Sequence, residues 1–413
     1  MSFRFVHAAD LYLDTPFDRI GSVPPELREV VRDASLTAFA NLVDLAIARQ
    51  VAFVLLVGDT FDGIERGLRA QLHLRAGLER LSAQGIQTFI VRGRAAGPGD
   101  WSSVPGRPAG VTVFSDAGVQ AVDVERDGIR LATVHGSGGE GDDPLQGFTR
   151  DPSGGLHVGA IHCRVPGPST RSCRVDDLAA RGMDYWALGG AHAREVLSAA
   201  PWIAFAGTPQ GRGFRDPELG PKGALLVSFD GRVLQVPEFV PLDAVRCLRL
   251  TVDVTQARDL SALTAELVDR AEELRLQHRG PALLLRATLT GSGPLRVELM
   301  RPGALDDLLR DLRDAVRGAA EPLWWDAVED ETRPSRDWTE LQRRGDLTAE
   351  LIRLHQGLLD DPERLRTLAA ERFAPLRRVL PGGEATADPA MLADLLTEAA
   401  TLAIDLLEEW DRA

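Results

Sequence analysis

The chain has 413 residues, 44% of them hydrophobic, which is enough to bury one large core and a smaller domain or two. No apolar run approaches the roughly 18 residues of a membrane-spanning helix, and the first residues lack a signal-peptide pattern. The three cysteines form no C-x-x-C pair, which argues against a disulfide framework and a thiolate zinc site. We therefore expect a cytoplasmic protein that does not associate with membranes.

The net charge of −14 is concentrated in the last quarter of the chain. Residues 301–413 contain 25 acidic side chains and 15 arginines, a net charge of −10. Because binding to phosphates requires cations, this segment is not expected to lie along nucleic acid by itself. A protein partner and ordinary solvated helix faces both fit this charge.

The first hundred residues predict a parallel sheet covered by helices. Three short apolar segments have the composition of buried strands, and the two stretches between them have helical spacing: residues 3–9, 26–49, 51–57, 68–83 and 87–91. Such alternation is typical of doubly wound α/β folds, in which functional groups collect beyond the carboxyl ends of the strands. Asp10, Asp59 and Arg94 all follow these predicted strands.

The remainder of the chain divides into three parts. Short apolar strands dominate up to residue 240, and we expect them to form a second sheet layered on the first. Residues 241–300 read as strand, helix and strand, a compact α+β domain, and residues 301–413 read as helices broken by prolines. The predicted domains are therefore 1–240, 241–300 and 301–413, with Trp324 and Trp325 between helices.

Polar residues follow several of the predicted strands in an ordered series of short motifs. These motifs are residues 7–17, 58–62, 160–162, 185–192 and 206–223. Over roughly residues 1–240 their order and spacing resemble the SbcD-type DNA-repair exonucleases of the calcineurin-like metallophosphoesterase superfamily. The resemblance implies an α/β fold, a two-layer sheet sandwich flanked by helices, followed by a small α+β capping domain and C-terminal helices.

The resemblance also implies a metal site. In that family two divalent cations share a bridging carboxylate and activate a water molecule for in-line attack on a phosphodiester. The positions of this sequence that match the ligands and retain them are Asp10, Asp59, His162 and His192. Mixed carboxylate and imidazole ligands suit Mn²⁺.

Other positions of the same motifs carry residues that cannot replace the expected ligands. Tyr12, Arg94, Ala95 and Gly190 stand where the resemblance implies histidine, asparagine, histidine and histidine. The site is therefore expected to hold either one weakly bound Mn²⁺, at Asp10, Asp59 and His192, or no metal. Arg94 either stands in for the lost cation by pairing with Asp59 or faces solvent.

These losses predict a non-catalytic or weakly active homologue of a DNA-repair nuclease, a pseudoenzyme subunit, and no residue is assigned a catalytic role. The alternative is an active metal-dependent exonuclease or phosphodiesterase that uses a reduced one-metal site. His135 is a further candidate for recruitment, although a satisfied loop histidine fits the pattern better. Arg212 and Arg215 are either phosphate contacts or ordinary surface residues.

The expected partners also come from the resemblance. It implies an SMC-like coiled-coil ATPase that docks on the C-terminal helices, contact with DNA, and a homodimer. The predicted helix at 391–410 has an apolar face of the kind that docks in a groove, although packing within its own domain explains the same pattern.

Overall fold

The computed structural model describes residues 1–62, 67–93, 108–115, 117–138, 144–151, 155–163, 173–318, 322–333, 338–377 and 389–412. The chain forms two compact units, Met1–Thr332 and Arg333–Ala413. Each unit has its own apolar core.

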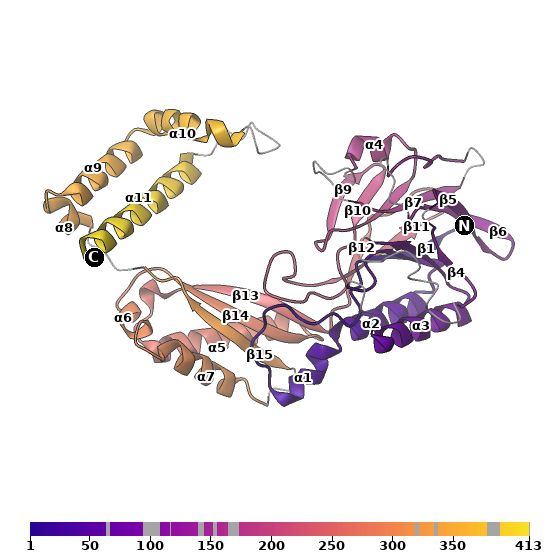
Figure 1. Ribbon diagram of the computed structural model, residues 1–413, viewed down its shortest axis with the longest axis horizontal. Coiled ribbons are helices and arrows are strands. Elements are labelled where there is room, and N and C mark those ends of the chain that lie inside the picture. Colours follow the sequence, from indigo (N-terminus) through magenta and orange to yellow (C-terminus); the bar gives the residue numbers. More distant parts are fainter. Residues whose placement is uncertain are drawn as a thin grey trace. The chain divides into compact units, whose positions relative to one another are not determined.

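The first sheet of the larger unit is largely parallel and has the strand order β12-β11-β1-β2-β3-β4. Its strands are β1 (Phe3–Ala9), β2 (Phe53–Gly58), β3 (Gln87–Arg92), β4 (Val111–Val113), β11 (Gly223–Phe229) and β12 (Glu238–Pro241). Every residue of β2 is buried, as expected of a central parallel strand. Helices α2 (Ala34–Ala48) and α3 (Leu68–Ala83) cover one face of this sheet, as Figure 1 shows.

The second sheet packs against the other face of the first and has the order β5-β6-β7-β8-β10-β9. Its strands are β5 (Gln120–Arg126), β6 (Ile129–Gly136), β7 (Leu156–His162), β8 (Tyr185–Gly189), β9 (Glu195–Ala199) and β10 (Trp202–Phe205). An aromatic core that includes Phe5, Phe53, Phe89 and Tyr185 fills the space between the sheets. Helix α4 (Val175–Ala179) covers the outer face, so the predicted two-layer α/β sandwich is confirmed.

An α+β domain completes the larger unit. Its elements are β13 (Val245–Asp253), a 3-10 turn (Val254–Gln256), α5 (Leu260–Gln277), β14 (Ala282–Thr290), α6 (Leu295–Leu299), α7 (Ala304–Ala315) and β15 (Leu323–Asp330). The three strands form a parallel sheet whose apolar core contains the helices. Helix α1 (Pro25–Arg32) packs against the start of this sheet, where Leu27 and Val31 share an apolar cluster with Val245 and Ala282.

Strand β15 departs from the expectation that residues 301–413 are helical throughout. Trp324 and Trp325 belong to this strand, and Trp325 is fully buried in the core of the α+β domain. The sequence leaves a short apolar run after Pro322 ambiguous, and pairing with β14 decides its conformation. The α+β domain therefore extends to about residue 332.

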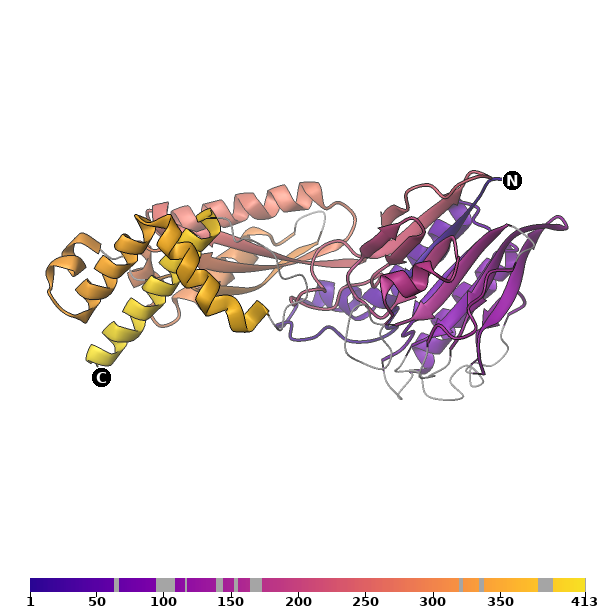
Figure 2. The ribbon, with the colours of Figure 1, turned by 90° about the horizontal axis from the view of Figure 1, so that it is seen from above.

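The smaller unit is helical, as expected for the end of the chain. It contains α8 (Trp338–Arg343), α9 (Leu347–Leu359), α10 (Pro362–Arg377) and α11 (Pro389–Arg412), coloured orange to yellow in Figure 2. Asp346 caps α9 by accepting a hydrogen bond from the Ala349 N–H group. Among the described residues, no helix is both long enough and apolar enough to cross a membrane.

Candidate metal centre

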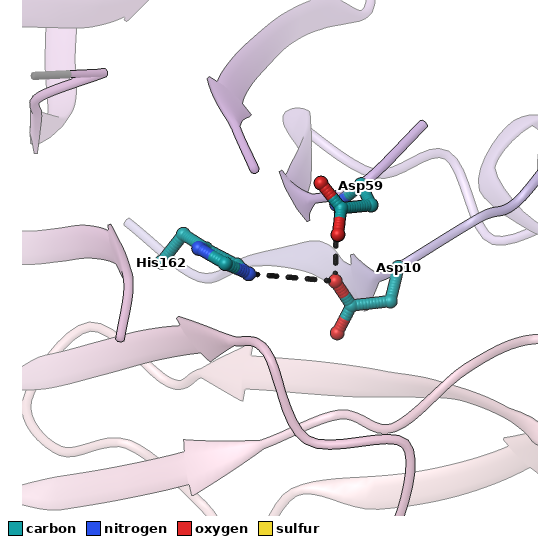
Figure 3. Close-up of side chains that lie close together, drawn as sticks. All are labelled: Asp10, Asp59 and His162. Carbon is teal, nitrogen blue, oxygen red and sulfur yellow. Dashed lines mark hydrogen bonds and ion pairs between the residues drawn. The ribbon is translucent and has the colours of Figure 1, made fainter. Parts of the chain in front are cut away.

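Three ligand-bearing side chains meet where strands of the two sheets end. Asp10 follows β1, Asp59 follows β2, and His162 is the last residue of β7. One potential ligand atom from each lies within 4.8 Å of the other two, and the side chains point toward one another (Figure 3). The carboxyl ends of strands from both sheets thus build one buried group, as the sequence predicts for this type of fold.

Asp10 is fixed by hydrogen bonds on both carboxylate oxygens. The Asp59 N–H group donates to Oδ1 at 3.0 Å, and the Gly190 N–H group donates to Oδ2 at 2.7 Å. The Thr208 hydroxyl donates to the Asp10 carbonyl oxygen at 3.0 Å. His162 Nε2 lies 4.0 Å from Oδ1, so its imidazole faces the same oxygen that Asp59 binds.

The electrostatics of this group favour a cation. Burial raises the pKa of Asp10, and the nearby charge of Asp59 raises it further, although His162 and the two backbone N–H donors oppose the shift. A bound cation would stabilise both carboxylates in their charged forms. Two carboxylates and one imidazole therefore fit one hard or borderline cation such as Mn²⁺.

Three glycines leave room for these side chains. A Cβ atom at Gly58 would lie 2.1 Å from Asp10 Oδ1, and one at Gly93 would lie 2.0 Å from Asp59 Oδ1. Gly190 has a φ of +108°, and a Cβ atom there would lie 3.0 Å from His162 Nε2. The sequence indicates Gly190 only as a position that lacks a ligand. In the structure its N–H group binds the Asp10 carboxylate, and the absence of a side chain leaves room for His162.

The expected cation site at Asp10, Asp59 and His192 differs from the group that the structure forms. His192 is engaged elsewhere: its Nδ1 lies 2.5 Å from Glu218 Oε1, and its Nε2 lies 3.1 Å from the Tyr12 hydroxyl. Among the described residues, the group that could hold a metal contains His162 in its place. A hydrogen bond with Glu218 would leave Nε2 open to a cation, but the Tyr12 hydroxyl lies beside that nitrogen.

Tyr12 connects His192 to the candidate metal centre. Its hydroxyl donates to Asp59 Oδ2 at 3.2 Å, and its ring packs edge-on against His192 with centroids 5.1 Å apart. Burial and the carboxylates of Asp10 and Asp59 raise the pKa of Tyr12 above its usual range. The phenol is therefore neutral at physiological pH and acts as a hydrogen-bond donor.

Glu218 was not singled out as a site residue in the sequence, although it lies within the motif at 206–223. Its Oε2 accepts a hydrogen bond from the Arg212 N–H group at 2.9 Å. Burial alone would raise the pKa of Glu218, but the hydrogen bond with His192 and the charge of Arg212 bring it below its usual value. Glu218 is therefore a charged anchor for His192.

Of the two predicted phosphate contacts, Arg212 lies closer to the centre. Its guanidinium lies 4.0 Å from the centroid of the Tyr12 ring, and its side chain is 13% exposed. Arg215 is 61% exposed and lies 3.9 Å from Asp18. Both arginines line a cleft of about 600 Å³ that also contains Arg249.

The remaining sequence predictions fall into two groups. Arg94 and Ala95 lie outside the described residues, so the proposed pairing of Arg94 with Asp59 stays a prediction. His135 lies in β6 with Nε2 3.0 Å from His157 Nδ1, and burial lowers its pKa to about 4, with a further contribution from His157. In the described part of the chain, His135 does not join the group that could bind a metal.

Comparison with known proteins agrees with the phosphoesterase fold. The family model described as "Metallophosphoesterase YhaO, middle domain" matches residues 248–333, which form the α+β domain. A curated relative, "Uncharacterized metallophosphoesterase YhaO" of Bacillus subtilis (strain 168), is 31% identical over 347 residues, covering 82% of this chain and 84% of the relative. The chain therefore belongs to the YhaO family of metallophosphoesterases.

Proposed function

We propose that this metallophosphoesterase homologue is a weakly active or non-catalytic subunit of a DNA-repair complex, related to the SbcD-type exonucleases. The observation that carries the proposal is the state of the residues around Asp59. Asp10 and His162 form with it a group that could hold a cation, whereas the Tyr12 hydroxyl lies 3.1 Å from His192 Nε2. Within the described part of the chain, the centre thus offers ligands for one cation.

Each residue of this centre has a role in such a protein. Asp10, Asp59 and His162 would hold the cation, which supplies Lewis-acid polarisation of a phosphoryl oxygen when bound. The backbone N–H groups of Asp59 and Gly190 orient Asp10 toward it. Arg212, beside the centre, would contact a phosphate oxygen of the bound substrate.

The same geometry accounts for weak chemistry. A two-metal centre stabilises both the attacking and the leaving oxygen, and a single cation supplies only part of that stabilisation. The imidazole of His192 is held between Glu218 and Tyr12, so it is not free to assist a leaving group. General acid–base assistance contributes about 10²- to 10⁴-fold in rate, and its loss lowers activity further.

A second candidate function is an active phosphodiesterase with a one-metal site. The observation that favours it is the cleft of about 600 Å³ that contains Arg212, Arg215 and Arg249. Guanidinium groups beside a cation would bind a phosphodiester substrate and orient it. This candidate uses the same three ligands and differs in the expected rate.

The proposed partner is an SMC-like coiled-coil ATPase that binds the helical unit. Support comes from apolar side chains that this unit exposes to solvent: Leu347, Leu354, Met391, Leu395 and Leu402. An amphipathic helix with an exposed apolar face docks well in the groove of another helical protein. DNA binding near Arg212 and formation of a homodimer belong to the same proposal.

Manganese content and nuclease activity, measured on the same sample, separate the two candidate functions. The wild-type chain and Asp59→Asn are incubated with Mn²⁺ and with single- and double-stranded DNA. We expect at most one Mn²⁺ per wild-type chain and cleavage that is absent or only slightly faster than that by Asp59→Asn. Fast metal-dependent cleavage that Asp59→Asn abolishes would support the active phosphodiesterase instead.

A further inference from the structure

Asp59 contacts two sets of side chains. Asp10 and His162 form the candidate cation site with it. The Tyr12 hydroxyl, which also faces His192, donates to Asp59 Oδ2. A carboxylate between two donor sets is the arrangement that lets one residue bridge two cations.

The second set holds a proton where a cation would need to bind. Glu218 faces His192 Nδ1, so Nε2 is the ring nitrogen that faces the Tyr12 hydroxyl. The hydroxyl lies 3.1 Å from this nitrogen and 3.2 Å from Asp59 Oδ2, to which it donates its proton. A cation bound to both atoms would have to displace this hydroxyl.

We propose that Tyr12, held in place by His192 and Glu218, occupies the second cation position of the centre and limits it to one bound cation. This inference rests on the proposed function. It names the residue that sets how many cations the centre binds. The phenol joins Asp59 to His192 as a cation would, but it brings no positive charge that could activate water.

Arg212 reinforces this limit independently of the hydrogen bonds. Its guanidinium lies 4.0 Å from the centroid of the Tyr12 ring, and a guanidinium does not lose its proton in proteins. A second divalent cation at the Tyr12 hydroxyl would lie near this fixed positive charge. Electrostatic repulsion therefore adds to the cost of a second cation while the guanidinium stacks on the phenol ring.

The test replaces the phenol with an imidazole in the full-length chain. Tyr12 has a φ of +44°, a region that histidine tolerates better than most residues, so Tyr12→His suits the backbone. The new imidazole, His192 and Asp59 would then supply three ligands for a second cation. We expect Mn²⁺ bound per chain to rise from one to two, and the electron paramagnetic resonance spectrum to change from that of an isolated ion to that of a coupled pair.

Two controls isolate the position of the new ligand. Tyr185→Phe alters the chain's other tyrosine, whose hydroxyl lies 3.0 Å from His7 Nδ1, and should leave one Mn²⁺ per chain. The double variant Tyr12→His/His192→Ala lacks one of the three ligands and should return to one Mn²⁺. Circular dichroism verifies that every variant is folded.

A milder variant, Tyr12→Phe, tests the same assignment without a new ligand. Because the phenol is not a ligand in this account, folded Tyr12→Phe should still bind one Mn²⁺ per chain, with the lower affinity that loss of a hydrogen bond to Asp59 causes. Complete loss of Mn²⁺ from folded Tyr12→Phe, or a single Mn²⁺ in folded Tyr12→His, would overturn the assignment. Fast DNA cleavage by the wild-type chain with one Mn²⁺ bound would count against the proposed function alone, because stoichiometry is measured separately.

Discussion

At the scale of single residues, the centre depends on how each polar group is held. Asp10 would be a costly buried charge in isolation, and two backbone N–H groups satisfy its oxygens. His192, on the other side of Asp59, is held by Glu218. The hydrogen-bond partners of the two histidines therefore determine that His162, and not His192, faces the candidate cation site.

Glu218→Ala should destabilise the protein because it removes the acceptor for both His192 Nδ1 and the Arg212 N–H group. Hydrogen bonds that involve a charged group contribute about 1.5–3 kcal/mol each. His192 and Glu218 are partly exposed, so we expect the free energy of unfolding to fall by an amount near the lower end of that range. Chemical denaturation would measure it. The exposed residue Glu125 provides the control, since Glu125→Ala should change stability by less than about 0.5 kcal/mol. Equal effects of the two variants would show that Glu218 anchors nothing.

The family resemblance implied the ligand positions Asp10, Asp59 and His162, and in the structure each follows or ends a strand. It did not predict that His162 rather than His192 joins Asp10 and Asp59. The contact that fixes His192 is with Glu218, 26 residues away in an irregular segment. The role of Gly190 was also hidden. Gly190 acts through its backbone N–H group, which every residue except proline has, so its residue type does not reveal this role.

At the scale of elements, the centre exists because strands β1, β2, β7 and β8 end together and turn sharply. Asp10 and Tyr12 both have positive φ angles, of +50° and +44°, so the chain after β1 bends tightly beside the carboxylates. Gly190 makes the corresponding turn after β8. The precision of these turns controls the position of His162 and Asp10.

Gly190→Ala should weaken cation binding and destabilise the fold. The introduced Cβ atom would lie 2.9 Å from the Cys163 carbonyl oxygen and 3.0 Å from His162 Nε2, displacing a ligand. Gly280 is a matched control because its φ is also +108° but no atom lies within 4 Å of the position of its Cβ. Gly280→Ala should show only the backbone strain, about 1–3 kcal/mol. Calorimetric titration with Mn²⁺ should show lower affinity for Gly190→Ala alone; unchanged affinity would separate this turn from the cation site.

The elements that the sequence predicted best are those with continuous apolar patterns. The strand at 3–9 and the helix at 68–83 were predicted with the bounds that the structure shows. The sequence did not predict strands β5, β9 and β12. These strands lie at sheet edges and are partly or largely exposed, so they lack the continuous apolar pattern of a buried strand. Parallel pairing with β14, which no local pattern reveals, determines β15.

At the scale of the whole molecule, buried histidines should make stability depend on pH. Burial lowers the pKa of His7 to about 3 and is the main cause of the lowered pKa of His135, about 4. The unfolded chain takes up these protons first, near pH 6.5, so the neutral rings contribute fully above that pH and their contribution is lost as pH falls toward 4.

Thermal unfolding between pH 7 and pH 4.5 would measure this dependence. His135→Asn should lose less stability on acidification than the wild-type chain, whereas His73→Asn, at an exposed position on α3, should follow the wild type. Parallel pH profiles for all three proteins would mean that the His135 ring does not remain neutral in the fold.

The division into two units predicts separable functions. Leu402→Asp changes an exposed apolar residue of α11 that is 59% exposed, and it should weaken binding to the proposed SMC-like ATPase while leaving Mn²⁺ binding unchanged. Leu68→Asp, at a residue of α3 that is 71% exposed, is the control in the larger unit and should leave partner binding intact. Co-purification would measure both; equal binding by the two variants would place the partner surface elsewhere.

We propose that the centre holds one cation, bound between Asp10, Asp59 and His162. Anomalous X-ray scattering at the manganese edge, on crystals of the wild-type chain soaked in Mn²⁺, would locate each bound ion. We expect one anomalous peak within bonding distance of these three side chains, with the Tyr12 hydroxyl still beside His192. Two peaks at the Asp59 carboxylate, or one peak bound to His192, would exclude a single ion at these ligands.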